Sequence, residues 1–328
     1  MPTLLVTKKM PAALAGRVEA SVAGRRAQPG ARLAPRAMAL LRLGALSAVA
    51  GLAVWAASSF WAARQETRAL RAELLARVRS EAAELGPIDR QQPERVRPLL
   101  ARLAGPWEGD AFDPELRGAG RLARALERPT VYVRGPISSF GSRSGVDESA
   151  AASHVDAFVV CLLDPPLERT ERQVAPRARA ALRSGSEARR RVAHFGRLHD
   201  ALVALAYLEP EWEARIAEAR TRRQLVRLRD AFDAAPWAEG RRAARAELLL
   251  VVMDEPGDTS VPAELDGERP HEVRVGLVEI ASGRTLLRAR RPVDPRWASA
   301  ETRATLAAGI DACTLALEVT SAAASSGG

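Results

Sequence analysis

Residues 43–63 of this chain contain no charged side chain, while Arg42 and Arg64 lie at the two ends of the stretch. A bilayer core is about 30 Å thick and an α-helix rises about 1.5 Å per residue, so a helix of this length can cross it. Such a helix satisfies its own backbone hydrogen bonds, which lipid cannot do. The stretch therefore predicts a single transmembrane helix within residues 38–64.

The side chains of this stretch agree with a membrane span. Two tryptophans lie in its C-terminal half, where aromatic rings favour the membrane interface. Small residues recur four positions apart, a spacing that lets two helices approach closely, so a homodimer through this helix is one alternative. The residues assigned to the span are Leu43, Gly44, Ala48, Gly51, Trp55, Trp61 and Ala63.

Two other interpretations of the stretch stay open. A soluble domain can bury an apolar helix, although a soluble helix of this length normally shows a polar face. A cleaved signal peptide has an apolar core of about 7–15 residues that ends at a small-residue site, for which Ala57 and Ala63 are candidates. Met38 is also an alternative start. The length of the apolar core favours the uncleaved helix.

The positive charge of the chain is concentrated before and beside the span. Residues 1–64 hold nine basic residues and one acidic residue, so they carry +8 of the net charge of +9. Because positive flanks stay in the cytoplasm, we expect residues 1–37 to form a disordered cytoplasmic arm and residues 65–328 to lie outside the cytoplasm. The nearly neutral remainder lacks the basic footprint of a nucleic-acid-binding domain, so the expected partner of the charge is a lipid bilayer.

Residues 129–320 show the pattern of an α+β domain. The segment 156–164 is a near-continuous apolar run, which is typical of a strand covered on both faces. Together the β-rich runs predict a mixed sheet of about five strands with flanking helices. These strands are expected at 130–134, 156–164, 246–254, 272–280 and 285–290. The last two form the clearest hairpin signal of the chain.

Helical patterns precede, interrupt and follow this sheet. A juxtamembrane helical region is expected at 65–128, a helical insertion at 167–245 and a disordered tail at 321–328, whereas 137–154 has the composition of a surface loop. Apolar residues at helical spacing form one stripe that predicts either self-association or packing on the chain's own domain. The stripe consists of Leu70, Leu74, Val78, Ala82 and Leu85.

The chain has two cysteines, Cys161 and Cys313. The first lies in a predicted strand and the second in a predicted C-terminal helix, both on the extracytoplasmic side, where disulfides persist. A bridge between them would close a loop of about 150 residues and add roughly 4–5 kcal/mol in the chain-entropy model. Two separate buried thiols are the alternative, because the sequence does not supply the pairing geometry.

Motifs of high specificity for phosphate, nucleotide, zinc or acyl chemistry are absent from the sequence, and no cofactor or metal site is expected. The carboxylates Asp164, Asp254 and Glu255 follow the two longest apolar runs. If those strands are parallel neighbours, the acids meet at one sheet edge and can bind a divalent cation or share a proton. An aspartate that precedes a proline or a loop also simply starts a turn.

These patterns favour a membrane-anchored extracytoplasmic binding or scaffold protein of the bacterial cell envelope, without catalysis and with an envelope protein as partner. It would lie in the inner (cytoplasmic) membrane with a periplasmic domain. The predicted hairpin resembles hairpins of periplasmic envelope lipoproteins over residues 277–287, which assigns the chain to no family. The alternative function is a metal-assisted hydrolase that uses Asp164, Asp254 and Glu255. A sensor is the third alternative, although the N-terminal arm (residues 1–37) contains no recognisable output domain.

Overall fold

The structure is a computed structural model that describes residues 35–153, 157–182, 192, 194–257 and 269–326. The chain divides into two compact units, residues 1–66 and residues 67–328, which are described separately. The predicted cytoplasmic arm lies almost wholly outside the described residues.

Helix α2 (Pro35–Arg90) contains the predicted span. Within the first unit, the side chains of Leu43, Trp55 and Trp61 are 61%, 68% and 60% exposed. Among the described residues, two helical stretches are long and apolar enough to cross a membrane: Leu46–Ala104, whose apolar window is 0% buried, and Ala300–Ser325, whose window is 67% buried. The second stretch is therefore a core helix of its own unit.

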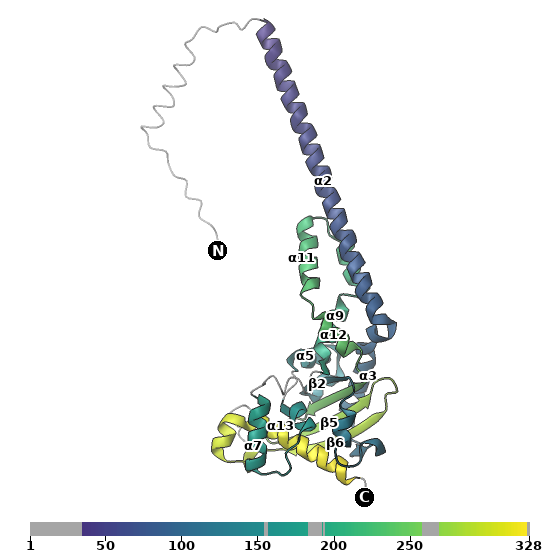
Figure 1. Ribbon diagram of the computed structural model, residues 1–328, viewed down its shortest axis with the longest axis vertical. Helices are drawn as coiled ribbons and strands as arrows, with labels where there is room; N and C mark the ends of the chain where they lie inside the picture. The colour runs from purple at the N-terminus through teal and green to yellow at the C-terminus, as the bar shows by residue number, and fades with distance from the viewer. Residues whose placement is uncertain (1–34, 154–156, 183–191, 193, 258–268, 327–328) are drawn as a thin grey trace, which may run out of the picture. The chain divides into compact units, whose positions relative to one another are not determined.

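The second unit contains a mixed sheet of six strands in the order β1-β6-β5-β4-β2-β3 (Figure 1). β2 runs parallel to β3 and β4, and the other pairs are antiparallel. The mixed α+β sheet is confirmed, with six strands where about five were expected. The strands are β1 (Ala111–Phe112), β2 (Thr130–Pro136), β3 (Phe195–Arg197), β4 (Leu248–Asp254), β5 (His271–Glu279) and β6 (Thr285–Val293).

Alternate side chains of β4 enter two separate cores. Leu248 and Leu250 belong to one, and Leu249 and Val251 to the other, as the two-residue period of a strand requires. Helices therefore cover both faces of the sheet (Figure 1). One face packs against α6 (Ala157–Leu163), α7 (Glu171–Leu182) and α13 (Ala300–Ser325), and the other against α3 (Gln92–Ala104), α5 (Arg143–Ala152), α9 (Leu198–Ala206) and α12 (Trp237–Ala244).

A third core joins α10 (Pro210–Glu218) and α11 (Arg222–Asp233) to the part of α2 that belongs to the second unit. Leu74 and Val78 of the apolar stripe are buried in this core. Of the two alternatives for the stripe, packing on the chain's own domain is the one observed at these positions. We call α10 and α11 the helical hairpin.

The predicted strand at 156–164 is wrong, because its described residues form helix α6. Five of the seven residues of α6 are buried, so apolar side chains are needed on almost every side. A fully buried strand and a fully buried helix have the same apolar sequence, and periodicity does not separate them. The strand missed by the sequence is β3, three residues that lie beside β2.

Two further segments differ from expectation. The predicted surface loop at 137–154 contains η2 (Ile137–Gly141) and α5, whose N-terminus is capped by Ser142 through the backbone N–H of Gly145. Helix α13 continues to Ser325, so residues predicted as a disordered tail are helical. Three of its last five residues are alanine, which has the highest helix propensity.

Gly135 explains how α5 reaches the end of β2. A Cβ atom at this position would lie 2.4 Å from the Oγ of Ser149 on α5. The hydroxyl of Ser153 completes the contact, since it donates to the carbonyl of Arg134 at 2.7 Å and accepts from its backbone N–H at 2.6 Å. These contacts fix the strand end at which the candidate site lies.

Candidate functional site

Asp254 ends β4, next to the parallel strand β2, where it lies opposite Pro136. The carboxyl ends of parallel strands are where α/β proteins place their ligands. Around this point the structure gathers a group that we call the strand-end cluster. Its members are Arg134, Asp254, Glu255, His271, Arg274 and Arg290.

Arg134 binds Asp254 through two hydrogen bonds. Its Nε and Nη2 atoms donate to the two carboxylate oxygens at 3.0 and 2.8 Å. Burial alone would raise the pKa of Asp254, but hydrogen bonds from His271 and Arg134 lower it overall. Asp254 is therefore an ionised partner of an arginine, whereas an acid that shares or donates protons needs a raised pKa.

Both ring nitrogens of His271 face oxygen atoms. Nδ1 lies 2.6 Å from the carbonyl oxygen of Arg269, and Nε2 lies 3.4 Å from a carboxylate oxygen of Asp254. The ring therefore connects the backbone of Arg269 to the carboxylate of Asp254.

Glu255 lies between two arginines that face each other across the β5–β6 hairpin. Arg274 and Arg290 are direct partners in the strand register, an arrangement that is unfavourable for like charges. Glu255 accepts from Arg274 at 2.6 Å and from Arg290 at 2.5 Å. Burial would raise the pKa of Glu255, but these two hydrogen bonds lower it overall. The carboxylate therefore bridges the two arginines and offsets one of their two charges.

Trp107 extends this network beyond the sheet. The guanidinium groups of Arg274 and Arg288 lie 5.4 and 5.5 Å from the centre of its ring, within the range of cation–π attraction. Arg274 also donates to the carbonyl of Gly105 at 2.6 Å. The segment after α3 is thus attached to the hairpin through one arginine.

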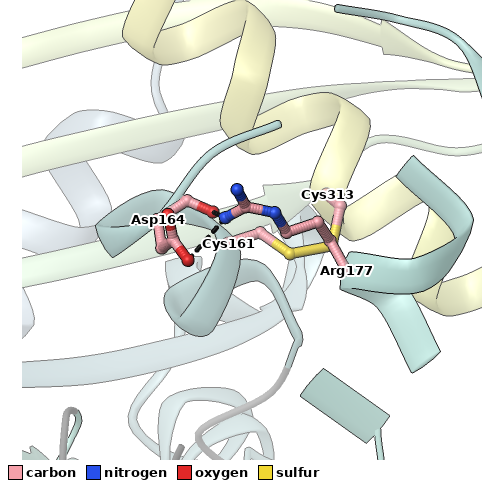
Figure 2. Close-up of a disulfide and its surroundings, with 4 residues drawn as sticks. All are labelled: Cys161, Asp164, Arg177 and Cys313. Atoms are coloured by element: carbon pink, nitrogen blue, oxygen red, sulfur yellow. Dashed lines mark hydrogen bonds and ion pairs between the residues drawn. A yellow bond between two sulfur atoms is a disulfide. The ribbon is translucent and has the colours of Figure 1, made fainter. Parts of the chain in front are cut away.

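Asp164 follows helix α6 and has a different arginine partner (Figure 2). Arg177 of α7 lies 2.5 Å from its carboxylate and donates to its backbone carbonyl at 2.7 Å. Each of the three predicted acids is therefore held by arginine. Within the described residues, no group of three or more His, Cys, Asp or Glu side chains has the arrangement to hold a metal ion.

Cys161 and Cys313 form a disulfide between α6 and α13 (Figure 2). Their Cα atoms lie 5.1 Å apart across a sequence separation of 152 residues. In the chain-entropy model a bridge of this span stabilises the fold by about 5 kcal/mol. It fastens two helices on the face of the sheet opposite the α3, α5, α9 and α12 layer.

Four aromatic residues lie on or beside the helical hairpin. Tyr207 packs edge-on against Trp212 at 4.6 Å, and Phe232 lies 4.7 Å from Trp237. A pocket of about 590 Å³ lies between α10 and α11. Arg215 stacks over the ring of Trp212 at 4.6 Å, and Glu218 also lines the pocket. The walls therefore offer an aromatic face together with basic and acidic groups.

The sequence missed the partners of the acids. Arg274 and Arg290 lie opposite each other because the strand register shifts between Leu277 and Val278, and the sequence did not predict this shift. Arg134 lies 120 residues from Asp254, and no local pattern joins them. Comparisons with protein families, with curated proteins and with solved structures found no match to this chain.

Proposed function

We propose that this chain is a membrane-anchored extracytoplasmic binding or scaffold protein of the bacterial cell envelope. The main observation that supports this proposal is the position of the exposed apolar surface. Of eleven large apolar side chains that are exposed in the described residues, eight lie between Leu43 and Trp61. A contiguous apolar surface of this kind belongs in a partner or a membrane, and its length suits the membrane.

Several features of the second unit support binding over catalysis. The acids of the strand-end cluster are ionised and paired with arginine, so they lack the raised pKa or open coordination that hydrolysis needs. The disulfide agrees with an oxidising compartment outside the cytoplasm. The pocket of the helical hairpin offers aromatic and cationic groups to an envelope partner. No described residue favours the hydrolase alternative.

Self-association is proposed only through the span. Leu74 and Val78 are used inside the chain, whereas nothing lies within 4 Å of a Cβ atom added at Gly44 or Gly51. These glycines leave room for a second helix to approach. The proposed homodimer contact is therefore limited to the membrane helix.

A topology experiment tests the proposal. Full-length chains carry either alkaline phosphatase or a fluorescent reporter after Gly328, and the mass of the membrane-bound product is measured. An active phosphatase on an uncleaved chain is the expected result. Leu52→Arg combined with Trp55→Arg should release the chain from membranes, because two central charges cost several kcal/mol in a span. A cytoplasmic C-terminus would overturn the proposed orientation, and a chain cleaved after the apolar stretch would overturn the anchor.

A further inference from the structure

The charge of the helical hairpin is unevenly distributed along its length. Residues 219–229 contain five arginines and no carboxylate. Arg220, Arg222 and Arg223 surround the turn between the two helices, and all three side chains are exposed. We call these three residues the hairpin tip.

Contacts within the second unit fix which way the tip faces along α2. Arg71 donates to the carbonyl of Ala219 at 2.5 Å, beside the tip. Arg77, farther along α2, forms an ion pair with Asp233 at the opposite end of α11. The tip therefore lies at the end of the helical hairpin that is nearer to residue 67 of α2.

Only a short length of chain separates the predicted span from Arg71, the residue of α2 that binds beside the tip. Eight residues separate Ala63 from Arg71. They cover about 12 Å as a helix and at most about 29 Å when fully extended. A chain of this length from an anchor that ends at Ala63 allows the tip to reach the membrane surface. The field of anionic headgroups extends about a Debye length, 8–10 Å, beyond that surface.

We propose that the hairpin tip binds the anionic phospholipid headgroups of the membrane in which the chain is anchored. The inference rests on the proposed anchor and adds a surface contact of the second unit. A guanidinium group binds phosphate oxygens in pairs, which suits lipid phosphates. Each basic residue near an anionic surface strengthens the association about fivefold. Three such residues make the contact strong enough to restrain the unit at the surface.

Hydrogen exchange on the full chain in nanodiscs tests this contact. One set of discs contains phosphatidylcholine alone, and the other contains added phosphatidylglycerol. We expect slower exchange of the backbone amides of residues 219–229 in the anionic discs, and loss of that protection in 0.5 M salt, because salt screens the charges. The variant Arg220→Gln/Arg222→Gln/Arg223→Gln should weaken the association about 100-fold and exchange equally in both discs.

A matched variant removes the same charge elsewhere. Arg121, Arg172 and Arg179 are exposed residues of α4 (Arg121–Ala125) and α7, and replacing all three by Gln should leave the protection intact. Equal loss of protection in this control would overturn the proposal, as would equal exchange of the native chain in both discs. Protection by inorganic phosphate in neutral discs would assign the site to a free anion. Failure of the chain to enter either disc would instead refute the anchor.

Discussion

The strand-end cluster and the hairpin tip are both rich in arginine, but the two regions use it differently. In the cluster, Asp254 and Glu255 each accept hydrogen bonds from arginine, so these arginines have acidic partners within the fold. At the tip, Arg220, Arg222 and Arg223 are exposed to solvent, and Arg229 farther along α11 is paired with Asp230. Arginine in the cluster thus connects strands of the sheet, whereas the arginines of the tip lie on the surface.

The largest expected effect comes from Arg134→Ala, which leaves Asp254 partly buried beside a broken pair. Removing one member of such a pair should lower the free energy of unfolding by about 2–3 kcal/mol. Denaturant titration of the full chain in detergent measures the change. Adding Asp254→Asn to this variant should restore part of the loss. A change below 0.5 kcal/mol would show that the strand-end pair does not stabilise the fold.

Lowering the pH should reduce the stability that the strand-end cluster contributes. The folded pKa values of Asp254 and Glu255 lie below their ordinary values of 3.8 and 4.5. The unfolded chain therefore binds more protons, and the stability contributed by these acids is present above about pH 5 and lost as the pH falls through the folded values. At pH 7, Asp254→Asn should cost about 1.5–3 kcal/mol. Unfolding measured from pH 7 to pH 3 should show this difference shrinking, and a constant difference would contradict it.

Trp107→Ala tests how the cluster is supported from outside the sheet. The ring faces Arg274 and Arg288, so its loss should cost about 1 kcal/mol. Trp107→Phe keeps an aromatic face and should retain most of the stability. Thermal unfolding of the two variants side by side gives the measurement. Equal destabilisation by both would show that an aromatic face beside the two arginines is not what stabilises this segment.

The smallest effect on stability is expected at the hairpin tip. Replacing its three arginines by Gln should change the free energy of unfolding by less than about 0.5 kcal/mol, as exposed substitutions do. Two of them lie in the first turn of α11, where positive charge opposes the helix dipole, so the sign should be neutral or slightly stabilising. A loss above 1 kcal/mol in neutral detergent would show that the tip is a structural element like the cluster.

Sequence patterns predicted the elements whose signals are local. The β5–β6 hairpin alternates apolar and polar residues around Gly283, which has a φ of 69°. The C-terminal helix that contains Cys313 was likewise predicted, and it is α13. Helix α6 was not predicted, because a segment that is buried on almost all sides shows no periodic pattern of apolar residues. The sequence also left the pairing of Cys161 with Cys313 open, since this pairing depends on how α6 and α13 pack on the same face of the sheet.

The candidate site was predictable only in part, for the same physical reason. Asp254 and Glu255 stand at the expected sheet edge, beside a parallel neighbour. Their chemistry, however, is set by Arg134, Arg274 and Arg290, which come from other strands. The stripe on α2 showed a face that needed a partner, but the partner lies more than 130 residues later, in the helical hairpin.

The disulfide has a consequence for the way this chain is made. Its two sulfur atoms come from residues 161 and 313, so β3, β4, β5 and β6 all lie inside the segment that it encloses. A chain synthesised from its N-terminus cannot close this bond until Cys313, and with it the whole sheet, has been made. The mobility of pulse-labelled chains on a non-reducing gel would therefore report the progress of folding after synthesis. Oxidised molecules contain every strand of the sheet and have brought α6 and α13 together.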